Sequence, residues 1–141
     1  RALQKQADKS GVGKQVQFMG GRSDIPEFLL AADLLLHPAR KENTGTVILE
    51  AMVAGLPVLI SNVCGYAKHV HQAQAGAILK QPDNAAETAS QLTSMLNPQR
   101  LHQWSEQALS YAATEDLYSM PDKAAQIIRD MAEKKAEINR D

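Results

Sequence analysis

Two carboxylates, Glu42 and Glu50, stand eight residues apart on either side of the small-residue stretch Thr44-Gly45-Thr46. The pattern predicts a loop that ends in a helix beginning near Thr46. The first N–H groups of a helix are free and lie at the positive end of its dipole, so they suit a phosphate. Gly45 would let the backbone come close to such a ligand.

The two glutamates would lie on opposite sides of that phosphate position. Glu50 follows Thr46 by four residues, so it shares a helix face with it and lies about 5 Å further along. A carboxylate at that distance can accept hydrogen bonds from both hydroxyls of a ribose, and Glu42 would face a sugar. The alternative is a helix cap and a solvated side chain, and the spacing by itself leaves both interpretations open.

The elements that must position this segment alternate between strand and helix. Short apolar runs predict strands at residues 16–19, 33–37, 57–60 and 76–79, and the run at 33–37 is typical of a strand buried on both faces. Helical patterns cover residues 1–10, 25–32 and 46–54, and three more helices follow Pro82. This order predicts an α/β fold, a Rossmann-like parallel sheet with helices on both faces. Ligands in such sheets bind beyond the carboxyl ends of the strands, which is where the Glu42 loop begins.

Local signals mark the ends of several helices. Asp24 with Glu27 predicts a capping box, and Asn84 and Asn97 are expected to cap later helices. Gly55 is expected to end the 46–54 helix in a left-handed conformation. We also expect Trp104 to pack into the core.

Composition and charge exclude several classes of function. The 141 residues carry 15 Lys and Arg against 16 Asp and Glu, mixed along the chain, which argues against a nucleic-acid partner. No apolar run approaches the ~20 residues of a membrane span, and we do not expect this chain to bind membranes. The single cysteine, Cys64, indicates a reducing, cytoplasmic compartment and is expected to be a buried thiol. A helical pattern that starts at residue 1 without an initiating Met leads us to expect a piece of a longer protein.

The stretch from Glu42 to Val58 resembles the signature of the retaining GT-B glycosyltransferases of family four. The matching features are Glu42, Glu50, the following Ala51-Met52, the turn Gly55-Leu56-Pro57-Val58, and the strand at 31–38 before them. The resemblance covers about residues 15–80 and implies an incomplete C-terminal, donor-binding half of a GT-B fold. We expect residues 1–120 to form part of a nucleotide-sugar-binding domain and residues 121–141 a C-terminal helix.

Segments at 21–24, 34–39, 63–67 and 116–119 are similar to the branch of this family that glucosylates the lipopolysaccharide core. That likeness implies a hexosyltransferase that moves glucose from UDP-glucose to the inner-core heptose. The parent enzyme would be peripheral on the cytoplasmic face of the inner membrane, and its N-terminal domain, absent here, would bind the acceptor. The chain alone is expected to be inactive.

The resemblance also implies roles for individual residues. Glu50 would bind the ribose, and Glu42, the expected catalytic residue, would contact hydroxyls of the donor sugar. Backbone groups would contact the rest of UDP-glucose: Asn43, Thr44 and Gly45 the sugar, Thr46 and Val47 the diphosphate, and Gly21 and Arg22 the uracil. No Asp-x-Asp motif occurs, so neither a metal nor another cofactor is expected.

Three neighbours of the motif have alternatives left open. Arg40 and Lys41 would pair either with Glu42 or with phosphate. His37 would be either a half-buried histidine bonded to the backbone or part of the donor pocket. His69 and His71 are not expected to bind metal, because no third ligand is near.

Two other functions fit the same pattern. A GT-B UDP-sugar epimerase would share the Gly55-Leu56-Pro57-Val58 turn, although the Glu42–Glu50 spacing favours the transferase. A nucleotide-binding module without activity is the second alternative. A Rossmann dehydrogenase is disfavoured because Gly-x-Gly-x-x-Gly is absent.

Overall fold

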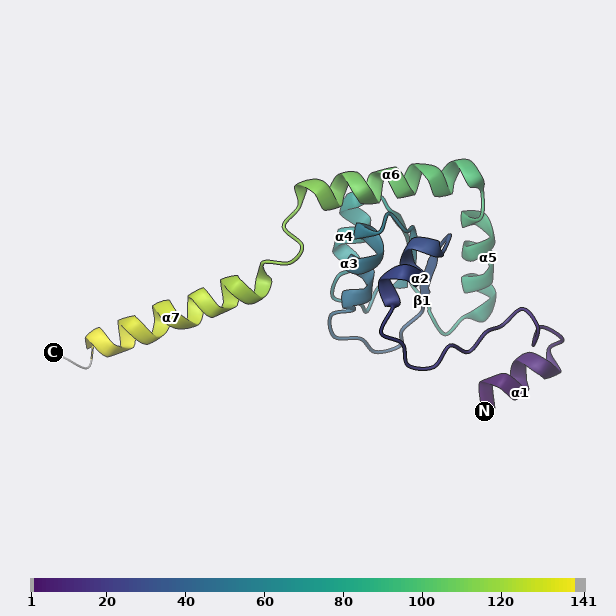
Figure 1. The fold of residues 1–141 in the computed structure, drawn as a ribbon, viewed down its shortest axis with the longest axis horizontal. Helices are drawn as coiled ribbons and strands as arrows, with labels where there is room; N and C mark the ends of the chain where they lie inside the picture. Colours follow the sequence, from purple (N-terminus) through teal and green to yellow (C-terminus); the bar gives the residue numbers. More distant parts are fainter. Residues whose placement is uncertain (1, 139–141) are drawn as a thin grey trace.

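The computed structural model describes residues 2–138, with side chains through Glu133, and within this range the chain builds a parallel sheet of three strands. The strands are β1 (Leu35–His37), β2 (Val58–Ser61) and β3 (Gly76–Leu79), in the spatial order β1-β2-β3. The helices around it are α1 (Ala2–Lys9), α2 (Ile25–Ala31), α3 (Thr46–Val53), α4 (Ala67–Ala73), α5 (Ala85–Met95), α6 (Pro98–Thr114) and α7 (Met120–Ile138). The predicted α/β fold with a parallel sheet is confirmed (Figure 1).

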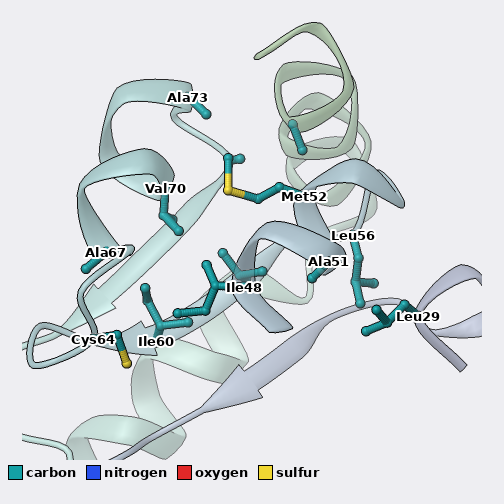
Figure 2. Close-up of a cluster of buried hydrophobic side chains, with 13 residues drawn as sticks. Leu29, Ile48, Ala51, Met52, Leu56, Ile60, Cys64, Ala67, Val70 and Ala73 are labelled. Carbon is teal, nitrogen blue, oxygen red and sulfur yellow. The ribbon is translucent and has the colours of Figure 1, made fainter. Parts of the chain in front are cut away.

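The central strand β2 divides the core into two clusters, since successive side chains of a strand point to opposite faces. Ile60 packs with α3 and α4 through Ile48, Met52 and Val70 (Figure 2). On the other face Leu59 packs with Leu79 and Met95, and Trp104 borders that cluster as expected. Helices therefore cover both faces, and every residue of β2 is buried.

The strand predicted at residues 16–19 is wrong. The segment is irregular and Phe18 is half exposed. A strand needs a partner for its backbone hydrogen bonds, and this segment pairs with no strand among residues 2–138. Only three of the four predicted strands are therefore found in the described chain.

The prediction that residues 33–37 form a strand buried on both faces is also wrong. β1 starts at Leu35, and its middle residue Leu36 keeps 38% of its surface exposed. The reason is position, because β1 lies at the edge of the described sheet and pairs with β2 alone. Leu36 lies opposite the fully buried Leu59.

The helix ends follow most of the sequence signals. Asn84 accepts from the N–H of Glu87 at 3.1 Å, and Asn97 accepts from the N–H of Arg100 at 3.1 Å. Gly55 adopts the expected left-handed conformation, with φ 72°. The exception is Asp24, whose carboxylate pairs with Arg22 (Nε to Oδ1, 2.8 Å) instead of capping α2. A neighbouring cation competed with the helix for the same oxygens.

One helix was missed. α4 buries Ala67, Val70 and Ala73, a spacing of three that lies against the core. Its Gln74 C-cap is left-handed, with φ 51°, a role that glycine or asparagine fills more often. Because neither glycine nor asparagine stands at this position, the sequence lacks the usual signal for the C-terminus of a helix.

The last helix, α7, leads away from the sheet and its covering helices in Figure 1. Ile127, Ile128 and Met131 are more than half exposed along it. Of the helices described, none is long and apolar enough to cross a membrane.

Candidate functional site

Residues 38–45 join the carboxyl end of β1 to α3; Glu42 lies on this loop, and Glu50 lies within α3. Gly45 is the N-cap of α3 and has φ 73°, a left-handed conformation that favours glycine. A Cβ there would also lie 2.9 Å from Cδ1 of Ile48. The N–H of Ile48 donates to the carbonyl of Gly45 at 2.9 Å. Because Gly45 has no side chain to cap the helix, the N–H groups of Thr46 and Val47 are left for another acceptor. Thr46 is exposed and Val47 half-buried at this end.

Glu42 is fixed from two sides. Its Oε1 accepts from the N–H of Asn43 at 2.8 Å, and its Oε2 lies 3.2 Å from Nε2 of His37. The N–H of Asn43 and, after it, His37 lower the pKa of Glu42. The carboxylate therefore stays ionised near neutral pH and acts as an acceptor of hydrogen bonds, which suits sugar hydroxyls. Its side chain is 28% exposed, so a ligand can reach it.

His37 belongs to this arrangement. Its ring is about a quarter exposed and contacts the Glu42 carboxylate, not the backbone. The structure thus joins His37 to Glu42, and a place for this residue in a donor pocket stays a prediction.

Glu50 lies on the exposed side of α3 and opens into two cavities. One, of about 320 Å³, is bounded by Thr46, Tyr66, Leu117 and Tyr118. The other, of about 290 Å³, is mainly apolar and lies between α2 and α3, where Pro26, Leu29 and Val53 line it. Glu42 lines neither cavity. The two carboxylates therefore share neither cavity.

Tyr118 is a residue of this site whose position the spacing did not predict. It lines both cavities with Glu50, and burial and then the charge of Glu50 raise the pKa of its phenol. It comes from the connector between α6 and α7, where Asp116 accepts from the N–H of Ser119 at 3.0 Å and from Lys123. The segment 116–119 was singled out only by resemblance, because a separation of 68 residues from Glu50 leaves no periodic signal.

Gly21 and Arg22 lie outside these contacts. Arg22 pairs with Asp24 and lies over the ring of Phe28, 5.1 Å from its centroid. The Asp24 carboxylate raises the pKa of the guanidinium. Pro26, four residues further on, does line the cavity beside Glu50. The start of α2 is thereby connected with the site, although Arg22 itself contacts neither glutamate through a described hydrogen bond.

Arg40 does not pair with Glu42, and pairing with phosphate, the other sequence interpretation, stays a prediction. It pairs with Asp83, and both side chains are more than 60% exposed. An ion pair this exposed contributes little to stability and does not hold Arg40 to one partner. Lys41 is exposed. Across residues 2–138, no three His, Cys, Asp or Glu side chains are grouped as metal ligands.

Comparison with known proteins places this geometry in context. Residues 1–111 match the family model described as "Glycosyl transferases group 1". The lipopolysaccharide glucosyltransferase WaaG of Escherichia coli K12 is 46% identical over 129 residues, which cover 91% of this chain and 34% of that protein.

Solved structures agree. The crystal structure of WaaG superimposes with a TM-score of 0.85 at 44% identity, over 91% of this chain and 35% of that one. Anabaena Alr3699/HepE in complex with UDP-glucose gives 0.76 at 26% identity, over 92% and 36%. This chain spans about a third of the length of these relatives. The matches favour the transferase interpretation over the epimerase and the inactive nucleotide-binding module.

Proposed function

Because this chain belongs to the group 1 glycosyl transferases, we propose that it forms the donor-binding part of a retaining transferase that uses UDP-glucose. The observation that carries the proposal is the arrangement around α3. An uncapped helix N-terminus lies between an ionised carboxylate, Glu42, and a second carboxylate, Glu50, that opens into two cavities. Such a series of groups matches the order of sugar, diphosphate and nucleoside in the donor.

Each part of the site then has its own task. Glu50 accepts hydrogen bonds from the ribose, and the N–H groups of Thr46 and Val47 bind the diphosphate. Glu42, with the backbone of Asn43, Thr44 and Gly45, holds hydroxyls of the glucose. Gly21 and Arg22 bind the uracil through their backbone.

The chemistry proposed for this site needs no metal. As the bond between glucose and UDP breaks, negative charge grows on the leaving diphosphate. The preorganised N–H groups of α3 stabilise that charge, together with basic side chains that we place in the rest of the parent enzyme. Glu42 orients the sugar and does not donate a proton, because its lowered pKa keeps it ionised.

The acceptor we propose is the inner-core heptose of lipopolysaccharide. The support is the 46% identity to a lipopolysaccharide glucosyltransferase. The acceptor-binding domain would belong to the two thirds of that relative that this chain does not span, and the parent enzyme would work at the cytoplasmic face of the inner membrane. The 141-residue chain alone should therefore show no glucose transfer.

The test compares Glu50→Ala with Glu42→Ala in the parent enzyme, by calorimetry with UDP and by transfer rates. Two charge-assisted hydrogen bonds to ribose contribute about 1.5–3 kcal/mol each, so Glu50→Ala should weaken UDP and UDP-glucose alike, by roughly tenfold to a thousandfold. Glu42→Ala should leave UDP affinity nearly unchanged and lower the transfer rate steeply.

Glu106→Ala is the matched control, because Glu106 is an exposed carboxylate on α6 far along the chain from the motif. It should change neither quantity. Loss of UDP binding in Glu42→Ala with retention in Glu50→Ala would invert the two roles. If both variants behave as the wild type does, the proposed roles are wrong, and Glu42 and Glu50 are a helix cap and a solvated side chain.

A further inference from the structure

The turn after β2 holds the Glu42 loop at both of its ends. We call residues 38–45 the donor loop and residues 61–66 the brace. At one end the hydroxyl of Ser61 donates to the carbonyl of Ala39 at 2.6 Å. At the other end the N–H of Tyr66 donates to the carbonyl of Thr44 at 3.2 Å. Ser61 is fully buried and Ala39 is half-buried, so their hydrogen bond is partly shielded from water.

Between these bonds the two backbones touch at Gly65. A Cβ on Gly65 would lie 2.6 Å from the carbonyl oxygen of Asn43 and 3.4 Å from Cα of Thr44. These are backbone atoms and cannot rotate away as a side chain would. Gly65 does not have a positive φ. Its conformation is therefore open to any residue, and what requires glycine is the close approach to the donor loop.

The brace itself is fixed by the core. The N–H of Asn62 donates to the carbonyl of Leu79 at 3.1 Å, which ties the start of the brace to β3. Cys64 is buried, and its N–H donates to the carbonyl of Ser61 at 3.2 Å. The brace continues into α4, whose Val70 lies in the main core cluster. A clash at Gly65 is thus expected to move the donor loop, which has no regular structure, more than the brace.

We propose that Gly65 and Ser61 are positioning residues that set the place of Glu42 and of the Asn43–Gly45 backbone. This inference rests on the proposed function, since it assumes that the donor loop holds the glucose of the donor. Glu42 is coupled to the brace through one residue, Asn43, because the N–H of Asn43 binds the Glu42 carboxylate while its carbonyl faces Gly65. Glu50 lies on α3 and depends on neither contact.

The first test is Gly65→Ala in the parent enzyme. The added methyl group must separate the two backbones by roughly 0.5–1 Å, and misplacement of catalytic groups by about 1 Å can lower a rate about 100-fold. We expect kcat for glucose transfer to fall between tenfold and 100-fold, while the Kd for UDP stays within about twofold. The ratio of the Kd for UDP-glucose to the Kd for UDP should rise.

Ser61→Ala is the second variant, because it removes only the hydroxyl and introduces no clash. It should change kcat and the Kd ratio in the same direction and by less. Val63→Ala is the matched control, since Val63 lies in the same turn with 43% of its surface exposed. It should leave both quantities at their wild-type values.

A protein that is merely less stable would bind UDP and UDP-glucose with an unchanged ratio once folded. The positioning role of Gly65 would therefore be wrong if Gly65→Ala changed neither kcat nor the ratio of the Kd for UDP-glucose to the Kd for UDP. It would also be wrong if the variant lost affinity for both ligands equally.

Amide NMR of the 141-residue chain separates this inference from the proposed function. Gly65→Ala should shift the signals of Thr44 and Gly45 and leave that of Glu50 in place. If the signals of the donor loop do not shift, Gly65 does not position that loop, whatever ligand the chain binds. A different outcome is that Gly65→Ala shifts the loop signals while Glu50→Ala binds UDP as the wild type does. That outcome would contradict the proposed function and support the positioning role of Gly65.

Discussion

The donor loop and α3 each hold one carboxylate, and they hold it by different physical means. Glu50 keeps its place because α3 is a regular helix whose opposite face, Ile48, Leu49, Ala51 and Met52, is buried. Glu42 lies on a segment without regular structure, fixed by residues up to 22 positions away, such as Ser61 to Ala39. Helical periodicity places the first group, and close contacts between distant segments place the second. The helix should therefore be sensitive to lost core volume, and the loop to small backbone displacements.

The largest effect that we expect is on the helix. Ile48 is fully buried in the main cluster, so Ile48→Ala should lower the free energy of unfolding by about 2–5 kcal/mol. Val53→Ala, on the exposed side of the same helix, should change it by less than about 1 kcal/mol. Urea unfolding of both variants measures the difference. Equal destabilisation would show that α3 is not held by its core face.

Gly45, at the junction of the two regions, should give the next largest effect. A left-handed conformation costs a residue with a Cβ about 1–2 kcal/mol, so Gly45→Ala should lower stability by that amount. The new methyl group would also meet Cδ1 of Ile48 at 2.9 Å. In an Ile48→Val background Cδ1 is missing, so the free energy of unfolding that Gly45→Ala still loses should come from backbone strain alone.

Gly55→Ala is a suitable control for Gly45→Ala. Gly55 has nearly the same φ, 72°, but contacts the side chain of Leu109. Both variants should lose stability in urea, while only Gly45→Ala should alter the NMR signals of Glu42. A matching change of those signals in both variants would mean that the junction does not control the loop.

A smaller effect is expected at His37. The N–H of Asn43 lowers the pKa of Glu42 more than His37 does, so His37→Ala should raise this pKa toward 4.5 without reaching it. Titration of the Glu42 carboxyl followed by NMR measures the change. His71→Ala, an exposed histidine on α4, should leave the titration unaltered. If the pKa of Glu42 does not rise in His37→Ala, the imidazole does not contribute to holding the Glu42 carboxylate in place.

The smallest effect should come from the connector that places Tyr118 beside Glu50. Lys123 and Ser119 lower the pKa of Asp116 to about 2 from an ordinary 3.8. The ionised group thus stabilises the fold fully above pH 3.8, and this contribution is lost as the pH falls toward 2. Asp116→Asn should lower the urea midpoint at pH 7, and the difference from wild type should shrink below pH 4.

Asp33→Asn, at an exposed carboxylate before β1, is the control for Asp116→Asn and should leave the urea midpoint at pH 7 unchanged. A constant difference for Asp116→Asn between pH 7 and pH 2.5 would contradict the role of its charge.

The contrast between loop and helix also explains what the sequence could predict. The start of α3 at Thr46, the buried strand β2 and the caps at Asn84 and Asn97 depend on neighbours within a few residues, and they were predicted correctly. The spacing of Glu42 and Glu50 was visible for the same reason. The roles proposed for them remain predictions.

Features that depend on distant partners were missed or misjudged. The exposure of Leu36 follows from the place of β1 in the sheet, and residues 16–19 pair with no strand in the described chain. One local feature was also misjudged, because Arg22, two residues before Asp24, pairs with the carboxylate that was expected to cap α2. The contact of Gly65 with Asn43 and the place of Tyr118 beside Glu50 join segments that no local pattern relates.

The edge position of β1 has a consequence for handling the protein. One side of β1 pairs with β2, and among the described residues no strand covers its other side. A row of open backbone groups beside an exposed leucine is a template for strand addition by another molecule. Concentrated preparations of this chain should therefore tend to aggregate through β1. A charged residue in place of Leu36 would oppose the addition of strands from other molecules to β1, as lysines do on the edges of many natural sheets.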